Sequence, residues 1–415
     1  MEELKAGWRK VKLGDIIDFN PKETLKKNTI SKYVEMAQLQ CFARNIIGYS
    51  FKEYKGGTKF RNGDTLLARI TPCLENGKTA FVDILEEDEV GFGSTEYIVL
   101  RKKEGYTDEN YIFYLAISDL FRQIAIKSMT GTSGRQRVQT EVLKNSEIVI
   151  PEVNIQKKIA SILSLLDEKI ELNRKINQNL EEIAQALFKR WFIDFEFPNK
   201  EGKPYKSSGG KMIKSELGEI PEGWRSFSLK DIVKQIKPGT NFQPKRLDKG
   251  IPFLNIKNIV NSEIDLNDVK YISEVDYEKV HKTWKPQEKD ILISRIGTLG
   301  LVTILKKNKL PIAVHYNFLV IKAKKISSYF LYFLLKSQEF QKKYDSIKKQ
   351  SVQEYVTVED VEEIKVVLPE NLEILYEKYF ISFYKEIIKN QDEIYKLKEL
   401  RDYLLPKLMS GEISV

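Results

Sequence analysis

The chain has 415 residues, enough for two or three domains that each bury a hydrophobic core. Lysine and arginine number 68 against 59 aspartates and glutamates, and the formal net charge of +9 is compatible with a polyanionic partner. No apolar run reaches the roughly 18 residues of a membrane span, and MEELKAGWRK lacks the apolar core of a signal peptide. Two cysteines, Cys41 and Cys73, and two histidines argue against a zinc site and for reduced thiols in a cytoplasmic protein.

Segments of the first half of the chain recur in the second half. Three pairs carry the repeat: GWRKVKLGDIIDF from Gly7 with GWRSFSLKDIVKQ from Gly223, DTLLARI at 64–70 with DILISRI at 290–296, and IVIPE at 148–152 with VVLPE at 366–370. The spacing between partners varies, so insertions fall in loops. The repeat therefore indicates one duplicated unit of about half the chain and not a solenoid.

Each repeat begins with a globular part of short strands and helices. The predicted strands are rich in β-forming residues and lie at Thr65–Ala68, 97–100, Ile291–Ser294 and 318–321. Aromatic, amphipathic segments at 110–127 and 328–349 predict helices, in which Tyr111 and Tyr114 match Tyr329 and Tyr332. The IVIP and VVLP runs predict strands that end at proline.

Residues 155–192 show an uninterrupted heptad pattern, and a second pattern in matching register begins at residue 376. The first seam is Ile159, Leu163, Leu166, Ile170, Asn173, Asn177, Leu180, Ala184, Leu187 and Trp191. The second seam is Tyr376, Phe380, Phe383, Ile387, Asn390, Ile394, Leu397, Arg401, Leu404 and Leu408. We expect two long helices that bury these seams against each other as an antiparallel coiled coil. The alternative is two unrelated surface helices, each packed on its own domain.

Asn173 and Asn390 occupy the same position of the two seams. If they are buried in neighbouring layers, the polar pair fixes the register of the helices and lowers their stability. The alternative is that Asn173 faces solvent.

The predicted fold class is α+β. Two globular α/β domains are separated by two long antiparallel helices, and the chain has an internal pseudo-twofold axis. The predicted boundaries are 1–150 for the first globular domain, 151–196 for the first helical region, 197–222 for a connector, 223–368 for the second globular domain and 369–415 for the second helical region. The connector is predicted from its glycine, proline and serine content.

Catalytic motifs are missing from the sequence. It has no GxxxxGK[ST] phosphate loop and no glycine-rich dinucleotide fingerprint after a strand. The Asn-Pro-Pro-aromatic tetrad of adenine methyltransferases is missing too, because the one Asn-Pro pair, Asn20-Pro21, is followed by Lys22. The sequence therefore predicts a binding protein without catalytic residues.

Polar loops that differ between the two halves are the candidate binding sites. Arginine presents paired donors that match guanine O6 and N7, glutamine matches adenine N6 and N7, and hydroxyls suit phosphate oxygens. The candidates in the first half are Arg69, Lys78, Thr132, Ser133, Arg135, Gln136 and Arg137. The candidates in the second half are Arg295, His315, Tyr316, Asn317, Gln350, Ser351 and Gln353. Simple surface solvation is the alternative for each.

Three strings resemble one protein family over nearly the whole chain. They are residues 180–224, beginning LEEIAQALFKRWFIDFEFPNKEGKPY, residues 161–173, SILSLLDEKIELN, and residues 400–413, LRDYLLPKLMSGEI. With the half-chain repeat, they resemble the specificity subunit of type I restriction–modification systems. One departure is the start of the second helix, ENLEILYEKYF, which lacks the glutamine–lysine start at Gln156.

The resemblance implies that each globular part is a target recognition domain that reads one half of a split, asymmetric sequence in double-stranded DNA. It implies that the helices set the gap and carry two methyltransferase subunits that use S-adenosylmethionine. Restriction and translocase subunits that use ATP and Mg complete a complex for defence against foreign DNA. This chain itself would bind no cofactor or metal and catalyse nothing.

The length of the first seam is compatible with such a spacer. It covers about 33 residues, or roughly 50 Å of α-helix, and half-sites on one face of DNA lie roughly 34 Å apart per helical turn. Two alternative functions of a different class remain open. One is a methyltransferase with an unrecognised motif, and the other is a coiled-coil scaffold that is indifferent to DNA sequence.

Overall fold

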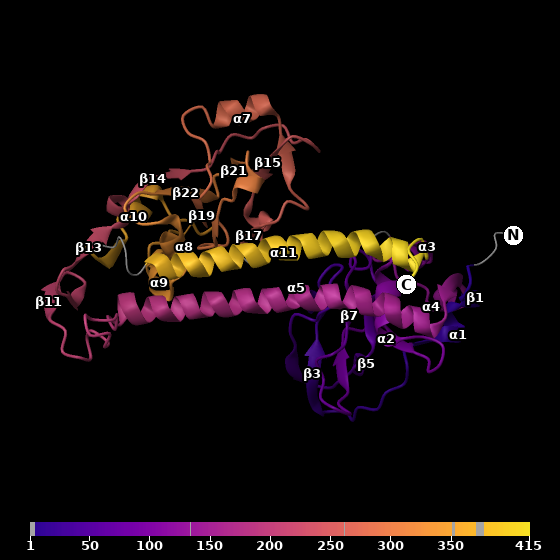
Figure 1. Cartoon of the computed structure of the whole chain (residues 1–415). Helices are drawn as coiled ribbons and strands as arrows, with labels where there is room; N and C mark the ends of the chain where they lie inside the picture. Colours follow the sequence, from indigo (N-terminus) through magenta and orange to yellow (C-terminus); the bar gives the residue numbers. More distant parts are fainter. Residues whose placement is uncertain (1–4, 133, 261, 351–352, 371–376) are drawn as a thin grey trace. The chain divides into compact units, whose positions relative to one another are not determined.

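The computed structural model describes residues 5–132, 134–260, 262–350, 353–370 and 377–415. The chain divides into two compact units (Figure 1). Unit 1 comprises Met1–Lys175 with Asn390–Val415, and unit 2 comprises Ile176–Lys389. Each unit therefore combines one globular part with segments of both long helices. The domain boundaries predicted from the sequence instead separate the globular parts from the long helices. They remain a prediction.

The central sheet of unit 1 has the order β2-β9-β6-β7, with β6 and β9 antiparallel. Leu66 and Val99 pack on one side of this sheet and Leu67 and Ile98 on the other. Since both faces are buried, these strands are continuous apolar runs without polar alternation. The strands of unit 1 are β1 (Trp8–Lys12), β2 (Ile17–Phe19), β3 (Ile30–Val34), β4 (Ser50–Glu53), β5 (Thr58–Phe60), β6 (Thr65–Ala68), β7 (Thr79–Phe81), β8 (Gly91–Gly93), β9 (Tyr97–Lys102) and β10 (Glu147–Pro151).

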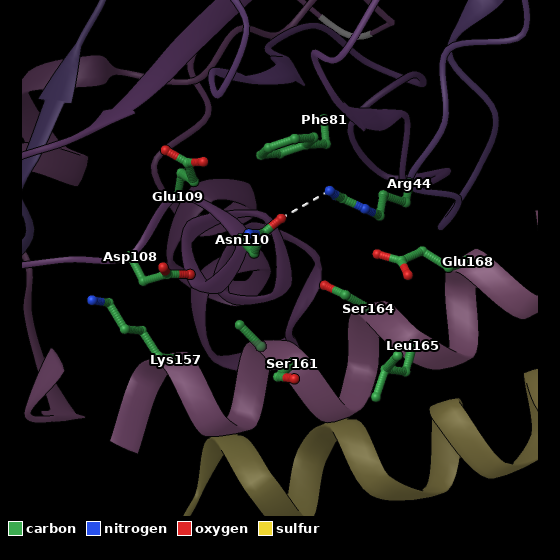
Figure 2. A pocket seen from close by; sticks show the side chains of 11 residues that line it. Arg44, Phe81, Asp108, Glu109, Asn110, Lys157, Ser161, Ser164, Leu165 and Glu168 are labelled. Carbon is green, nitrogen blue, oxygen red and sulfur yellow. Dashed lines mark hydrogen bonds between the residues drawn. The ribbon is translucent and has the colours of Figure 1, made fainter. Parts of the chain in front are cut away.

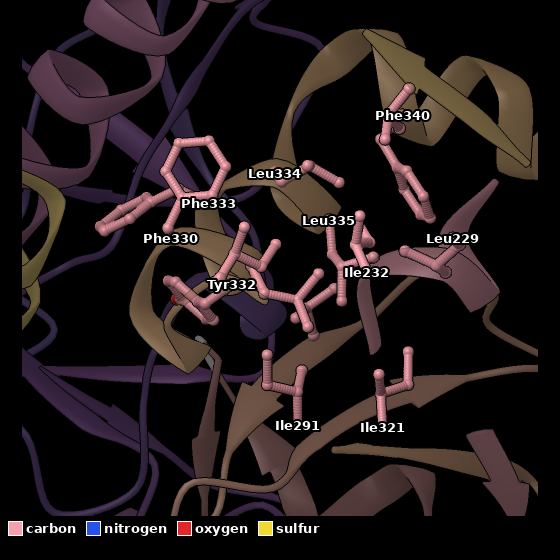
Figure 3. Packing of buried hydrophobic residues seen from close by; sticks show 14 of the residues in the cluster. Leu229, Ile232, Ile291, Ile321, Phe330, Tyr332, Phe333, Leu334, Leu335 and Phe340 are labelled. Atoms are coloured by element: carbon pink, nitrogen blue, oxygen red, sulfur yellow. The ribbon is translucent and has the colours of Figure 1, made fainter. Parts of the chain in front are cut away.

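Unit 2 repeats this sheet as β14-β22-β19-β20. Figure 3 shows Ile291 and Ile321 of the sheet and the aromatic side chains of α8 that belong to the same core. The opposite face buries Leu292 and Val320. The strands of unit 2 are β11 (Met212–Ser215), β12 (Gly218–Pro221), β13 (Trp224–Ser228), β14 (Val233–Pro238), β15 (Ile251–Leu254), β16 (Ile259–Val260), β17 (Glu263–Ile264), β18 (Lys270–Ile272), β19 (Ile291–Ser294), β20 (Val302–Ile304), β21 (Ala313–Val314), β22 (Phe318–Ala323) and β23 (Lys365–Pro369). The four strands predicted from β-forming residues are β6, β9, β19 and β22.

The repeated segments form equivalent elements in both units. GWRKV and GWRSF become β1 and β13, which pair antiparallel with the IVIP and VVLP strands β10 and β23. In the two ladders Trp8 faces Pro151 and Trp224 faces Pro369, so each closing strand ends at its proline as predicted. Asp64 and Asp290 directly precede the central strands β6 and β19 and accept hydrogen bonds from the backbone N–H groups of Arg61 and Gln287. The repeat therefore preserves the sheet framework.

The two predicted amphipathic helices are each divided at a serine. Ser118 and Ser337 have extended backbones, with ψ of 149° and 145°, and each side chain accepts a hydrogen bond from the backbone N–H three residues later. Because such a serine caps a new helix, the prediction of one continuous helix was wrong in both units. The helices are α1 (Leu13–Ile16), α2 (Glu109–Ile117), α3 (Asp119–Lys127), α4 (Thr140–Asn145), α6 (Leu229–Ile232), α7 (Glu274–Val280), α8 (Ser328–Lys336), α9 (Gln338–Ser346) and α10 (Val358–Glu362).

The long helices are α5 (Val153–Phe188) and α11 (Glu377–Met409), and they pack antiparallel within each unit. In unit 1, Asp167 contacts Arg401 and Asn173 contacts Glu393, so residue numbers rise on α5 as they fall on α11. In unit 2, Asn177 donates a hydrogen bond to the carbonyl of Ile387 at 3.2 Å. The predicted pairing is confirmed, and the alternative of two unrelated surface helices is wrong.

Most seam residues are buried or half-buried in this pairing. The buried ones include Ile159, Leu163, Ile170, Ala184, Trp191, Phe380, Ile387, Arg401 and Leu408. The half-buried ones are Leu166, Asn177, Leu180, Leu187, Phe383, Ile394, Leu397 and Leu404. Tyr376 lies outside the described residues. The α-helical geometry of α5 ends at Phe188, four residues before the predicted end, and continues as a π-helical turn, Lys189–Ile193.

The two seam asparagines are buried: 1% of Asn173 and 5% of Asn390 is exposed. The alternative in which Asn173 faces solvent is therefore wrong. The Nδ2 group of Asn173 donates to Glu393 at 2.9 Å, and Lys169 lies 3.6 Å from the same carboxylate.

The predicted connector is more structured than its composition suggested. It contains the hairpin of β11 and β12, and Phe197 stacks between Tyr205 and Trp224 with ring centroids 4.6 and 4.8 Å away. Among the residues that the structure describes, no helix is both long and apolar enough to cross a membrane.

Candidate nucleic-acid interface

Three segments that are distant in the sequence meet at one end of the central sheet of unit 1. Arg69 directly follows β6, the turn 94–96 joins β8 to β9, and the loop 130–138 follows α3. The backbone N–H of Arg69 donates to the carbonyl of Glu96 at 2.9 Å, and the carbonyl of Arg69 accepts from the N–H of Val138 at 2.9 Å. The end of β6 thereby holds the turn and the loop together.

The loop 130–137 is a small hairpin. Thr130 and Arg137 exchange backbone hydrogen bonds of 3.0 and 2.9 Å at its base, and the N–H of Arg135 donates to the carbonyl of Thr132 at its tip. The side chains of Thr132 and Arg135 are exposed, and Ser133 lies outside the described residues. Exposed polar groups on a hairpin closed at its base are well placed to contact a ligand.

Arg137 and Glu96 form a bidentate ion pair between the loop and the turn. Arg137 Nε lies 3.0 Å from both carboxylate oxygens, and its Nη2 lies 2.7 Å from Oε1. The backbone N–H of Glu96 donates to Ser94 Oγ at 3.1 Å, which fixes the turn that carries the carboxylate. The hydrogen bonds from Arg137, assisted by the charge of Arg69, lower the pKa of Glu96.

The other predicted residues of unit 1 have protein partners. Arg69 Nη2 donates to the carbonyl of Val138 at 3.3 Å, while its buried Nε has no hydrogen-bond partner among the described residues. Lys78 Nζ donates to the carbonyl of Met36 at 2.8 Å, and the carbonyl of Gln136 accepts from the N–H of Thr71 at 3.0 Å. Lys78 is thus engaged with the backbone and is less available to a ligand than the loop.

Unit 2 builds the same backbone arrangement. The N–H of Arg295 donates to the carbonyl of Asn317 at 2.7 Å, and the N–H of Val356 donates to the carbonyl of Arg295 at 3.0 Å. Lys349 and Tyr355 exchange hydrogen bonds of 2.8 and 3.1 Å and close the second loop. On this loop Gln350 and Gln353 are exposed, and Ser351 lies outside the described residues.

The side chains at these equivalent places differ. Asn317 stands where unit 1 has Glu96, and Tyr355 stands where it has Arg137. Asn317 Nδ2 donates to Asn255 Oδ1 at 3.3 Å, and among the described residues no partner reaches its buried Oδ1 or the buried Nε of Arg295. Polar atoms that are buried without hydrogen-bond partners are costly to a folded protein.

His315 is the first residue of the turn 315–317 in unit 2, and it is only 8% exposed. Its Nδ1 accepts a hydrogen bond from the backbone N–H of Asn317 at 3.4 Å, which requires a neutral ring nitrogen. Burial, assisted by the charge of Arg246, lowers the pKa of His315 and keeps the ring neutral. The N–H of Tyr316 donates to the carbonyl of Thr240 at 2.9 Å and ties the turn to the segment after β14.

Sequence reasoning missed Glu96 and Arg246. Glu96 belongs to a short polar turn, and the similarity of YIVL in β9 to FLVI in β22 would have aligned it with Asn317. Arg246 stacks over the ring of Phe253 with its Cζ 4.1 Å from the centroid. No local pattern marks Arg246, because its neighbour Phe253 belongs to the next strand.

A separate cavity of about 390 Å³ lies in unit 1 where α2 faces α5 (Figure 2). Arg44 donates to Asn110 Oδ1 at 2.8 Å and stacks on Phe81, and Glu168 projects from α5 nearby. Leu165 also lines it and is 62% exposed. None of the predicted DNA-binding residues that the structure describes lines this cavity.

Comparison with known proteins identifies the family. The family described as "Type I restriction modification DNA specificity domain" matches residues 5–182 and 221–400, one match on each half. The chain belongs to this family. It is a DNA specificity subunit of a type I restriction–modification system and, by family, is not a catalytic subunit.

Relatives of this specificity subunit match three quarters or more of its length. It is 27% identical to the "Type I restriction enzyme HindI specificity subunit" of Haemophilus influenzae over 98% of this chain and 100% of that protein. It is 31% identical to the "Type I restriction enzyme MjaIX specificity subunit" of Methanocaldococcus jannaschii over 75% of this chain and 71% of that protein. The crystal structure of a type I restriction–modification S subunit from M. genitalium has the same fold, with a TM-score of 0.53, 17% identity and 99% and 98% coverage.

Proposed function

We propose that the globular part of each unit reads one half of a bipartite, asymmetric DNA site. The supporting observation is that both units hold a turn and a loop at the end of the central sheet with the same backbone hydrogen bonds, yet carry different side chains there. Equivalent frameworks with different contact groups suit two different half-sites. The predicted contact residues are those of the loops 130–138 and 348–356, the turn 315–317, and Arg69, Lys78 and Arg295.

The chemistry of the two surfaces differs in a way that base recognition can use. Unit 1 offers arginines and one glutamine, which suit guanine and adenine edges in the major groove. Unit 2 offers Asn317, Gln350 and Gln353, whose amides suit adenine. Phosphate contacts from the neighbouring lysines and hydroxyls would set the register of each unit on the duplex.

The central test is the methylated motif of the host genome, read with and without this gene and then with single-unit variants. We expect a split motif that disappears with the gene. Changes in the loop of one unit should alter one half of the motif only. Methyl transfer by the isolated chain would instead support an enzyme, and sequence-independent DNA binding would support a scaffold. Specific binding should weaken steeply with salt while keeping its site preference.

We propose that the paired helices act as the ruler of the site, which means that their length sets the gap between the two half-sites. Helix α5 has 36 residues and α11 has 33, or roughly 50 Å each at the rise of an α-helix. Inserting seven residues into both seams should lengthen the recognised gap or abolish binding, with each half-site unchanged. The matched control inserts seven residues at the exposed turn between β11 and β12, where the gap should not change. An unchanged gap after the seam insertion would contradict the ruler.

We propose that two methyltransferase subunits, which use S-adenosylmethionine, dock on the outer faces of these helices. Leu165 and Leu172 lie one heptad apart on α5, and 62% and 51% of their surfaces are exposed. Leu165→Lys should reduce co-purification of the methyltransferase subunit without changing the melting temperature. The control Lys169→Gln changes a half-buried cation of the same helix that lies 3.6 Å from Glu393, and it should leave co-purification unchanged.

The restriction and translocase subunits, with their ATP and Mg, are proposed to join through that complex. A cytoplasmic location follows from the same proposal, because the DNA and the partner subunits are there. Co-purification of all subunits from the soluble cell fraction tests both the assembly and the location. If the restriction and translocase subunits do not co-purify with this chain, the proposed assembly is contradicted.

A further inference from the structure

A carboxylate within the surface proposed to bind DNA needs an explanation. Glu96 lies beside the loop of unit 1, where a negative charge repels phosphate and lowers affinity. Its side chain is 24% exposed and that of Arg137 is 45% exposed. Ion pairs this exposed contribute little to stability, so stability alone does not account for Glu96.

The geometry of the pair points to a positioning role. Glu96 occupies the edge of the guanidinium formed by Nε and Nη2. Arginine has five N–H donors in a planar fork, so the edge formed by Nη1 and Nη2 remains outside the pair and can still present two parallel donors. Guanine offers two matching acceptors, O6 and N7, in the major groove.

Hydrogen bonds of the backbone hold the described parts of the loop and the turn on either side of this pair. Arg137 is held at the base of the hairpin by Thr130, and Glu96 is held by Ser94 Oγ and by the backbone N–H of Arg69. The Arg137 side chain therefore has its conformation fixed before DNA arrives. Fixing a side chain in its bound conformation in advance removes the entropy that binding would otherwise cost.

We propose, resting on the proposed function, that Glu96 is the positioning residue that fixes Arg137 to read one guanine of the half-site recognised by unit 1. Arg137 makes the base contact, and Glu96 restricts the directions in which its donors can point. Unit 2 has Asn317 and Tyr355 at these places, so its half-site is read without such an arginine.

The test is a selection of randomised bipartite duplexes with the full-length chain in complex with its methyltransferase subunits. In Glu96→Gln the amide keeps the shape of the side chain but loses the charge that holds the guanidinium. We expect the preference for guanine at one position to fall roughly 2- to 5-fold, because the ion pair that positions the guanidinium is partly exposed and therefore weak. Total affinity should stay equal or rise, because a negative charge is removed.

Two variants make the result specific. Arg137→Lys, which keeps the charge but loses the fork, should reduce the guanine preference at the same position. Glu147→Gln is the matched control, because Glu147 also pairs with an exposed cation, Lys10, at 2.6 Å in unit 1. It should leave every position of the motif unchanged.

The outcomes separate the inference from the proposed function. A guanine preference that persists in Glu96→Gln, or a change in the half-site read by unit 2, overturns the inference and leaves the bipartite reading intact. A wild-type complex with no split preference overturns both. An affinity loss equal at all positions also overturns the inference, because it indicates a general structural role for Glu96.

Discussion

The two units attach their globular parts to the long helices through tyrosines at the same place in the repeat, but with different chemistry. In unit 1, Tyr114 donates to Asp167 at 2.8 Å, and Asp167 pairs with Arg401 at 2.7 Å. In unit 2, Tyr332 donates to Glu181 at 2.9 Å, and Lys336 completes the group. The first network joins a domain helix to both long helices.

The difference between the networks is their access to water. The side chains of Asp167 and Arg401 are 5% and 8% exposed, whereas those of Glu181 and Lys336 are 30% and 21% exposed. Unit 2 also packs rings at its junction, with Tyr332 and Tyr384 5.1 Å apart. The duplicated tyrosine thus keeps its position, while the buried ion pair of unit 1 corresponds to a partly exposed ion pair beside aromatic packing in unit 2.

Of the substitutions at the two junctions, removal of the Asp167 charge should lower the free energy of unfolding the most. Asp167→Asn leaves the buried Arg401 cation with only the exposed carboxylate of Asp402 as counter-charge, and we expect a loss of up to about 3–5 kcal/mol in the free energy of unfolding. Denaturant unfolding of the full chain measures it. Asp402→Asn is the control, because Asp402 contacts the same guanidinium from a position 64% exposed and should cost about 1 kcal/mol or less. An equal loss in Glu181→Gln would show that the two junctions do not differ.

The tyrosine hydroxyls provide a second test of the difference between the two junctions. Tyr114→Phe removes a buried hydrogen bond to a charged group and should cost about 1.5–3 kcal/mol, while Tyr332→Phe should cost about 1 kcal/mol because water reaches Glu181 and Lys336. Thermal melting of both variants tests whether Tyr114→Phe lowers stability more than Tyr332→Phe. The control is Tyr111→Phe, since the buried hydroxyl of Tyr111 has no partner among the described residues and its removal should be neutral or stabilising. The reverse order would contradict the water-access argument.

Acid should weaken unit 2 before unit 1, because both histidines of the chain, His281 and His315, belong to unit 2. Burial lowers the pKa of His281 to about 4, below its unfolded value near 6.5. The unfolded chain then binds a proton first, so stability is complete above pH 6.5 and falls as the pH drops towards 4. The loss at pH 5 should be about 2 kcal/mol or less.

Hydrogen exchange at pH 7 and pH 5, with rates corrected for pH, measures this for each unit. Peptides of unit 2 should lose protection and those of unit 1 should not. Asp64 and Asp290 do not disturb the comparison, because burial raises the pKa of both and each unit has one of them. His281→Phe should remove most of the difference, and an unchanged difference would exclude His281 as its source.

The seam asparagines give the smallest effect. Asn173 Oδ1 is buried and has no hydrogen-bond partner in the described part of the chain, so Asn173→Leu should raise the free energy of unfolding by about 1 kcal/mol. Asn390→Leu should raise it by less, because Asn390 has an interaction partner. Thermal melting measures both. A lower melting temperature for Asn173→Leu would show that its bond to Glu393 outweighs the cost of its burial.

Much of the framework could be predicted from the sequence, because the period of a pattern is a local property. The heptads predicted both long helices, and the apolar runs predicted β6 and β19 to the residue. The predicted helices at 110–127 and 328–349 failed at Ser118 and Ser337, where an N-cap bond outweighs helical periodicity. At the candidate interface the sequence pointed to Arg69, Arg137 and Asn317 but not to Glu96, whose importance depends on a residue 41 positions away.

By itself the sequence determined the duplication, the paired helices and the absence of catalytic motifs, since each follows from residue order along one stretch or from its recurrence. Only the tertiary structure decided that Asp167 meets Arg401 in a dry junction, and that Glu96 pairs with Arg137. Those contacts join segments brought together by the sheet and the helix pair. Which charges meet, and how much water surrounds them, depends on three-dimensional packing that no local pattern encodes.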